Sequence, residues 1–141
     1  MKRIAVAVLL AASCATAAFA GPIEDRQQLM KNVQAATKDG VGLARGATPF
    51  DAAKATAVLQ VYIDASAKLP TLFPAGSDTD PKSTAAPKIW TDMAGFKTAA
   101  AGFGADAKAG LAATDTASFN AAFTKITADC TACHGSYRVK K

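Results

Sequence analysis

The chain has 141 residues, of which 50% are hydrophobic, and a formal net charge of +5 at pH 7. After residue 20 its lysines are scattered singly, and basic residues cluster only at the end of the sequence, at Arg138, Lys140 and Lys141. This pattern excludes the basic stripe of a nucleic-acid-binding domain, and a chain of this length without internal repeats is expected to form one domain.

Residues 1–20 have the pattern of a cleavable signal peptide. Two basic residues at positions 2 and 3 precede an apolar run over residues 4–12, and residues 18–20 read Ala-Phe-Ala, the small-residue pattern before a cleavage site. The run is too short and too rich in alanine for a membrane span, so we expect export to the periplasm. Acylation of Cys14 is the weaker alternative, because a lipoprotein site needs a leucine-like residue at position 11. Cleavage leaves residues 21–141 as the mature domain, with a net charge of +3.

Two amphipathic helices are predicted in the first half of the mature domain. Apolar side chains recur every three or four residues over 22–45 and again over 48–69. Gly46 is a suitable stop for the first helix. The second helix is expected to begin with Thr48 as its N-cap and Pro49 at its first position.

The second half predicts a long connection and two further helices. Residues 70–88 are rich in proline, glycine and aspartate, so they cannot be helical throughout. A third helix is expected to begin with Thr91 as its N-cap, with Trp90 packed in the core. Asp115 is expected to cap a fourth helix, whose inward stripe runs to Tyr137. Four helices of similar length, without a convincing strand, predict an all-α, antiparallel four-helix bundle.

The last predicted helix ends in the sequence Cys130-Thr131-Ala132-Cys133-His134. Two cysteines separated by two residues, with a histidine directly after the second, form the signature of covalent c-type haem attachment. On a helix both thiols lie on one face, where they can add to the two vinyl groups of one porphyrin. The imidazole of His134 is a natural axial ligand for the iron. We therefore predict one covalently bound haem c in the core of the bundle.

Three other uses of these cysteines are weaker. A structural zinc site would need a fourth ligand beside Cys130, Cys133 and His134, and Cys14 lies in the predicted signal peptide. A thioredoxin-like redox pair needs a βαβ pattern, and no strand-like run precedes the motif. A surface disulfide is the remaining alternative. A peroxidase is disfavoured, because the only histidine is committed to the iron and leaves no distal acid or base.

The chain resembles the class II cytochromes c, which comprise the high-spin cytochromes c′ and their low-spin relatives. The resemblance covers the whole mature domain, and its most specific element is a haem motif near the C-terminus followed by an arginine. Other segments similar to the family are Arg26-Gln27-Gln28-Leu29-Met30, residues 72–77 and residues 87–92. The resemblance implies a non-enzymatic haem protein that exchanges one electron with redox partner proteins in a bacterial periplasm.

The same resemblance leaves a second function open, and the two functions differ in whether Met30 coordinates the haem iron. Family members fill this position, which faces the iron opposite His134, with a ligating methionine or with a side chain that does not ligate. A methionine sulfur makes the iron six-coordinate and suited to electron transfer, whereas a five-coordinate iron binds nitric oxide or other small gases. The low-spin, Met/His-ligated branch is favoured here, although a methionine on an inward stripe is also a common core residue. High-spin members often form dimers through the first two helices, so the resemblance also allows a homodimer.

Two arginines complete the expected site. By resemblance, Arg26 lies one turn before Met30 and pairs with a haem propionate, which a guanidinium can bind through two hydrogen bonds. The alternative is a solvated arginine in the first turn of a surface helix. Arg138 lies one turn after His134 and is expected to shield the histidine and tune its basicity. The alternative is a favourable cation near the helix C-terminus.

Overall fold

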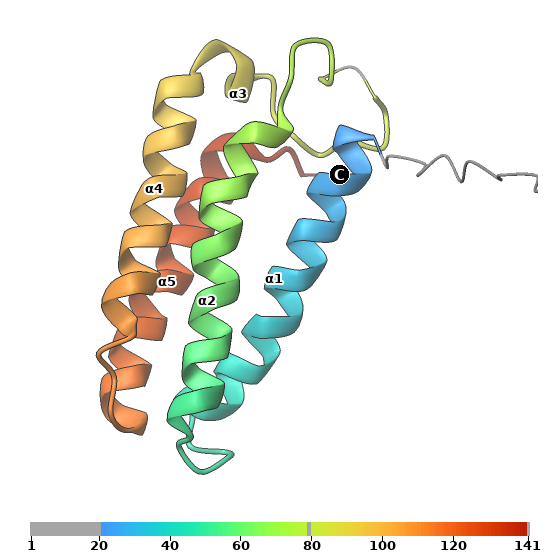
Figure 1. Ribbon diagram of the computed structural model, residues 1–141. Helices are drawn as coiled ribbons and strands as arrows, with labels where there is room; N and C mark the ends of the chain where they lie inside the picture. Colours follow the sequence, from blue (N-terminus) through green and yellow to red (C-terminus); the bar gives the residue numbers. More distant parts are fainter. Residues whose placement is uncertain (1–20, 79, 141) are drawn as a thin grey trace, which may run out of the picture.

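The computed structural model describes residues 21–78 and 80–140, so the predicted signal peptide at residues 1–20 lies outside the described residues. The helices are α1 (Pro22–Ala44), α2 (Ala52–Lys68), the 3-10 helix η1 (Leu69–Leu72), α3 (Lys88–Thr91), α4 (Met93–Gly110) and α5 (Thr116–Tyr137). The four long helices run alternately down and up, and α5 returns to contact α1 as well as α4 (Figure 1). The predicted antiparallel four-helix bundle is therefore confirmed.

The two turns at the far end of the bundle follow local sequence signals. Gly46 has a positive φ of 67° just after α1, as expected for a glycine that stops a helix. Asp115 caps α5, where its carboxylate accepts a hydrogen bond from the Ser118 amide at 2.8 Å and the Ser118 hydroxyl accepts one from the Asp115 amide at 3.2 Å. This reciprocal pair is a capping box, and it fixes the start of the helix that carries the haem motif.

The predicted start of the second helix was wrong by three residues. The amides of Ala47 and Thr48 both donate to the carbonyl of Gly42, at 3.0 and 3.3 Å, so they satisfy the end of α1 instead of opening α2. Asp51 is the actual N-cap, and its carboxylate accepts a hydrogen bond from the Lys54 amide at 3.0 Å. Helix α2 then ends at Lys68 and continues into the 3-10 turn η1.

The predicted cap of the third helix was also displaced by one residue. Thr91 is the last residue of α3, a short helix that the sequence did not reveal. Asp92 is the N-cap of α4, because its carboxylate accepts a hydrogen bond from the Gly95 amide at 3.1 Å. The other oxygen of Asp92 accepts a hydrogen bond from the Tyr137 hydroxyl at 3.0 Å. One carboxylate thus caps α4 and ties it to the end of α5.

The connection after η1 and the C-terminal tail close the other end of the bundle. An isolated antiparallel bridge pairs Ala85 with Arg138. The Ala86 amide donates to the Tyr137 carbonyl, and the Val139 amide donates to the Thr84 carbonyl, both at 2.9 Å. In Figure 1 this loop, α3 and the chain end lie together, and α1 leans away from α2 toward them. The loop therefore covers the end of the bundle at which α1 and α2 diverge.

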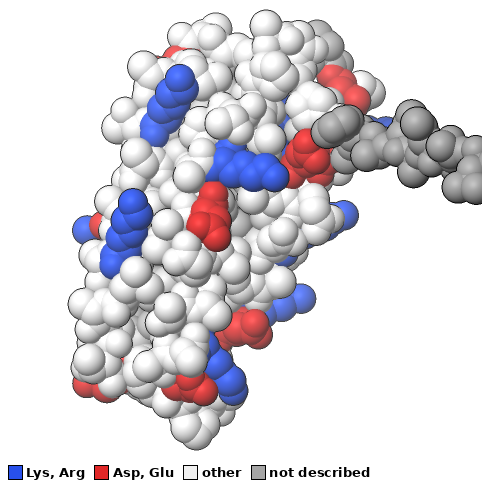
Figure 2. Space-filling view, in the orientation of Figure 1, with Lys and Arg blue, Asp and Glu red and all other residues white. Residues whose placement is uncertain are grey.

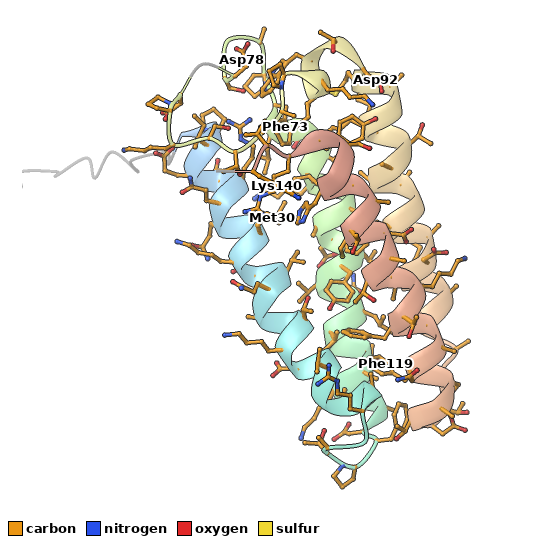
Figure 3. All side chains as sticks on the ribbon, turned by 180° about the vertical axis from the view of Figure 1, so that it is seen from behind. Met30, Phe73, Asp78, Asp92, Phe119 and Lys140 are labelled. Atoms are coloured by element: carbon orange, nitrogen blue, oxygen red, sulfur yellow. The ribbon has the colours of Figure 1, made fainter. Side chains whose placement is uncertain are left out.

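Two apolar clusters flank the middle of the bundle. The larger one lies toward the α1–α2 turn and includes Phe119, which is fully buried. The smaller one lies under the loop and includes Phe96 and Tyr137, with Phe73 packed against it. Figure 3 shows Phe119 near one end, Phe73 near the other and Met30 between them. The space between these clusters is where a cofactor can be held.

The surface carries charges of both signs. On the face shown in Figure 2, Lys and Arg side chains alternate with Asp and Glu side chains, and neither sign forms a continuous field. Within residues 21–78 and 80–140, no helix is both long and apolar enough to cross a lipid bilayer.

Gly40 allows α1 to approach α5 closely. A Cβ atom at this position would overlap the ring of Phe123, which is itself buried. We expect Gly40→Ala to lower the free energy of unfolding of the haem-loaded protein by about 1–3 kcal/mol, the usual cost of overpacking. Urea or thermal unfolding followed by circular dichroism measures this loss.

Gly102→Ala is the matched control, because this glycine is exposed in α4 and a Cβ there meets no atom within 4 Å. It should raise the free energy of unfolding by about 0.8–1.0 kcal/mol through helix propensity alone. A gain of similar size in Gly40→Ala would show that the ring of Phe123 can move aside at little cost.

Candidate haem site

A cavity of about 580 Å³ opens between α1 and α5, under the loop that closes the bundle. This volume is typical of sites that bind small molecules or cofactors. The cavity is lined by all six of the residues that the sequence marked as candidates, namely Arg26, Met30, Cys130, Cys133, His134 and Arg138. Residues 104 positions apart in the sequence, such as Met30 and His134, therefore face a common space.

Helix α5 provides the reactive wall of the cavity. Cys130 and Cys133 are half-buried and form no disulfide with each other, so the disulfide alternative is wrong. Burial raises the pKa of both thiols, and the negative charge of Asp129 raises that of Cys130 further. Both cysteines are consequently protonated near neutral pH. Their positions one turn apart, on one face of an uninterrupted helix, suit the two attachment points of a single porphyrin.

His134 follows on the same helix and is held as the neutral imidazole. Burial lowers its pKa, and the positive charge of Arg138 lowers it further. A neutral imidazole has a free nitrogen lone pair, which is the form that binds iron. The Arg138 amide donates to the His134 carbonyl at 3.2 Å, which holds the arginine one turn away. Both residues border the cavity and neither packs in an apolar cluster, so the burial of His134 is only partial.

Helix α1 provides the opposite wall. Met30 is half-buried, and Figure 3 shows it between α1 and α5 at the level of the cavity. The neighbouring apolar positions of this wall, Ile23 and Val33, lie on the same side of α1. A thioether is the soft donor of this wall that can coordinate a haem iron.

Arg26 closes the end of the cavity near the loop. Its side chain is only 6% exposed, and one guanidinium nitrogen, Nη2, donates to the Ser77 carbonyl at 2.9 Å. The guanidinium lies 4.5 Å from the centre of the Phe73 ring and 5.8 Å from that of Trp90. Burial lowers the pKa of Arg26, while the negative charges of Asp80 and Glu24 oppose this shift. The alternative of a solvated arginine at this position is therefore wrong, because Arg26 is buried.

The other guanidinium nitrogen of Arg26, Nη1, is buried and makes no hydrogen bond with the protein. Leaving a buried charged donor unpaired is costly, so an acceptor from outside the chain is expected at this point. A carboxylate is the best geometric partner for a guanidinium. The residues present therefore fit a haem, whose propionate would supply that acceptor.

Several lining residues were not identified from the sequence. Phe73, Ile89 and the segment 83–85 reach the cavity only because the loop folds back over α1 and α5. No local pattern marks these positions, because their role depends on contacts with distant residues. Trp90, expected in the core, is partly buried in the smaller cluster, and its indole N–H donates to the Pro74 carbonyl at 3.1 Å.

The contacts of Arg26 predict a measurable contribution to stability. Arg26→Gln removes the charge and shortens the side chain, so the Ser77 carbonyl and the Phe73 ring lose their cationic partner. We expect the free energy of unfolding of the haem-loaded protein to fall by about 1–3 kcal/mol, measured by urea unfolding. Arg45→Gln, at the exposed end of α1, should change it by less than about 0.5 kcal/mol. Equal stabilities of the two variants would contradict this role for Arg26.

A four-helix bundle whose Cys-x-x-Cys-His motif faces an internal cavity defines a c-type haem protein. Comparison with known proteins narrows this class. The family described as cytochrome C′ matches residues 21–138. The chain is 38% identical to cytochrome c-556 of Agrobacterium fabrum over 144 residues, covering 100% of this chain and 97% of the relative. It is 37% identical to a cytochrome c′ of Rhodopseudomonas palustris over 120 residues, covering 84% and 82% of the two chains.

Solved structures agree with this assignment. Cytochrome c′ from Rhodopseudomonas palustris superposes with a TM-score of 0.81 at 36% identity, covering 86% of this chain and 98% of that one. Oxidised cytochrome c556 from the same organism superposes with a TM-score of 0.77 at 30% identity, covering 85% and 97%. The chain belongs to the cytochrome c′ family, and its cofactor is covalently attached haem c. Both a cytochrome c-556 and a cytochrome c′ are similar to the chain. Family membership therefore does not identify the sixth ligand of the iron, which has to be inferred from the residues of the cavity.

Proposed function

We propose that the protein is a one-electron carrier in which His134 and Met30 are the two axial ligands of the haem iron. Cys130 and Cys133 form the thioether bonds. The observation that carries this proposal is the position of Met30 in the α1 wall of the cavity, across from the α5 wall that holds His134. The haem supplies the iron that changes oxidation state by one electron.

The residues around the iron then have distinct tasks. His134 is kept neutral by burial and by the charge of Arg138, so its nitrogen is free to coordinate. Arg26 binds a propionate through its unpaired nitrogen while its other nitrogen holds the loop at Ser77. The last turn of α5, which carries the proximal ligand, is tied to α4 by the hydrogen bond from the Tyr137 hydroxyl to the Asp92 carboxylate.

The spectrum of the wild-type protein tests this proposal. Ligation by Met30 predicts sharp visible bands of low-spin haem in the ferrous protein and a weak near-infrared band from sulfur to iron in the ferric protein. A high-spin spectrum without the near-infrared band would remove the electron-carrier proposal.

A five-coordinate protein that binds nitric oxide or other small gases is the alternative. Two observations favour it: Met30 is only half-buried, and a similar structure, of a cytochrome c prime variant from Alcaligenes xylosoxidans at 30% identity, was solved as a nitric oxide complex. In this case Met30 would line the gas pocket without binding the iron. Neither function includes catalysis of a reaction on a substrate.

We also propose export to the periplasm, where redox proteins would be the partners. Residues 1–20 have a signal-peptide pattern, and the family match begins at residue 21. A homodimer through the first two helices is proposed as well, since small side chains such as Ala35, Gly42 and Ala57 line a surface groove between α1 and α2. Sedimentation equilibrium of the purified protein tests the dimer, and a single mass equal to one chain plus haem would refute it.

A further inference from the structure

Two carboxyl groups and one ammonium group meet between α4 and α5, on the side of α5 away from the cavity. Lys125 Nζ lies 2.7 Å from Asp106 Oδ1, and Asp129 is close enough to this pair for both of its charges to act on the pKa of the Asp129 carboxyl. Oδ2 of Asp129 is buried and has no hydrogen-bond partner. None of these three residues, which we call the α4–α5 charge cluster, lines the cavity.

The two carboxyl groups of this cluster differ in their surroundings. The hydrogen bond from Lys125 lowers the pKa of Asp106, so Asp106 keeps its negative charge. Burial raises the pKa of Asp129, and the facing Asp106 carboxyl raises it further. Two close carboxyl groups rarely ionise together, and Asp129 is the one that keeps the proton longer.

Other charged groups lie on different sides of α5. Arg26 and Lys31 of α1 face the cavity, and Lys88 of α3 lies 5.4 Å above the ring of Tyr137. Apart from burial, the groups that act on the pKa of Asp129 are therefore Asp106 from α4 and Lys125 from its own helix.

Asp129 is also electrostatically linked to the haem-attaching segment. It directly precedes Cys130, and its negative charge is the second cause, after burial, of the raised pKa of the Cys130 thiol. A charge that acts on this sulfur would also act on the porphyrin, because the thioether bond holds the porphyrin directly on Cys130.

We propose that Asp129 is a proton acceptor for the electron-transfer reaction: its carboxylate takes up one proton when an electron enters the haem and releases it when the electron leaves. This inference rests on the proposed function. One electron from the redox partner reduces the iron from ferric to ferrous, and one proton from solvent forms an O–H bond on Asp129. No other bond forms or breaks, and the net charge of the protein is unchanged.

The direction in which the midpoint potential of the haem changes with pH follows from this one-proton, one-electron balance. An added electron makes the neighbourhood of Cys130 more negative, which raises the pKa of Asp129 in the reduced protein above its value in the oxidised protein. Between these two pKa values, the midpoint potential falls as the pH rises, by at most about 59 mV per pH unit for one proton per electron. Outside that range Asp129 contributes no pH dependence.

The test is the midpoint potential of the haem-loaded protein as a function of pH, from about pH 4 to pH 9, for three chains. The wild type should show a falling segment, and Asp129→Asn should lose the part due to this residue. Asp64→Asn, at an exposed site of α2, should behave as the wild type does. An unchanged profile in Asp129→Asn would overturn the proposal.

An infrared difference spectrum between the reduced and oxidised wild type gives an independent result. A carboxylic acid C=O band should appear on reduction, shift in heavy water, and be absent from Asp129→Asn. If that variant does not fold, Asp129→Glu should retain the band at a shifted frequency. The absence of any such band in the wild type would overturn the proposal. The visible spectrum decides the ligation of Met30 separately, so either proposal can fail alone.

Discussion

Replacing Met30 with alanine is expected to convert the haem from six-coordinate and low-spin to five-coordinate or water-bound and high-spin. The substitution deletes one axial bond but leaves His134 and both thioethers in place, so the fold should survive. Because Met30 is only half-buried, the loss of packing should cost at most about 2 kcal/mol. Visible and near-infrared spectra should lose the low-spin bands and the sulfur-to-iron band together.

Carbon monoxide binding gives a kinetic readout of the same change. In the wild type, carbon monoxide must displace a thioether, so binding to the ferrous protein should be slower than in Met30→Ala by on the order of tenfold or more. Each factor of ten in the binding rate corresponds to about 1.4 kcal/mol of activation free energy.

Met93→Ala is the matched control, because this methionine packs against the smaller cluster and does not line the cavity. It should leave the spectra and the binding rate unchanged. A wild type that is already high-spin and is unaffected by Met30→Ala would favour the gas-binding alternative.

Removing both thioether positions should have the second large effect. The double variant Cys130→Ala with Cys133→Ala cannot hold haem covalently, so the cavity of about 580 Å³ loses its fixed occupant. Apolar walls that pack on the porphyrin would then contact water or collapse, and Arg26 Nη1 would stay unpaired. We expect low yield and a fall in Tm of about 10 °C or more, since each kcal/mol lost shifts Tm by about 2–8 °C.

Extraction with acidified organic solvent measures the covalent bond directly. Haem should remain on the wild-type chain after denaturation, and mass spectrometry should place it on Cys130 and Cys133. Cys14→Ala is the control, since this cysteine lies in the predicted signal peptide and its loss should leave the mature protein unaltered. A wild-type protein that releases its haem would contradict covalent attachment. A double variant with the wild-type Tm would contradict a core that depends on the attached haem.

Local signals in the sequence were sufficient to predict the four long helices and the haem-attachment motif. Periodic apolar residues predicted all four long helices, and Gly46 and Asp115 were assigned their roles correctly because helix stops and capping boxes involve residues only a few positions apart. The Cys-x-x-Cys-His spacing predicted the cofactor for the same reason. Its three ligating or reactive groups lie within two turns of one helix.

The structure alone determined where the helices begin when a neighbouring element competes for the same backbone groups. Thr48 has the sequence of an N-cap, but its amide is used by the end of α1, and the role passes to Asp51. Thr91 is instead the last residue of α3, where its hydroxyl donates to the Lys88 carbonyl at 3.3 Å, and Asp92 caps α4. A propensity for capping is local, whereas the availability of a donor depends on how the chain has turned.

The end of the site near the loop was also decided by tertiary structure. The sequence marked Arg26 only through a family resemblance, and nothing near it indicated burial, stacking on Phe73 or the bond to Ser77, which lies 51 residues away. The approach of Asp129 to Asp106 is equally invisible in the sequence, because the two lie on separate helices. Burial and the pKa of a side chain depend on which groups the fold brings within a few ångströms, and a pattern along one helix contains no information about the facing helix.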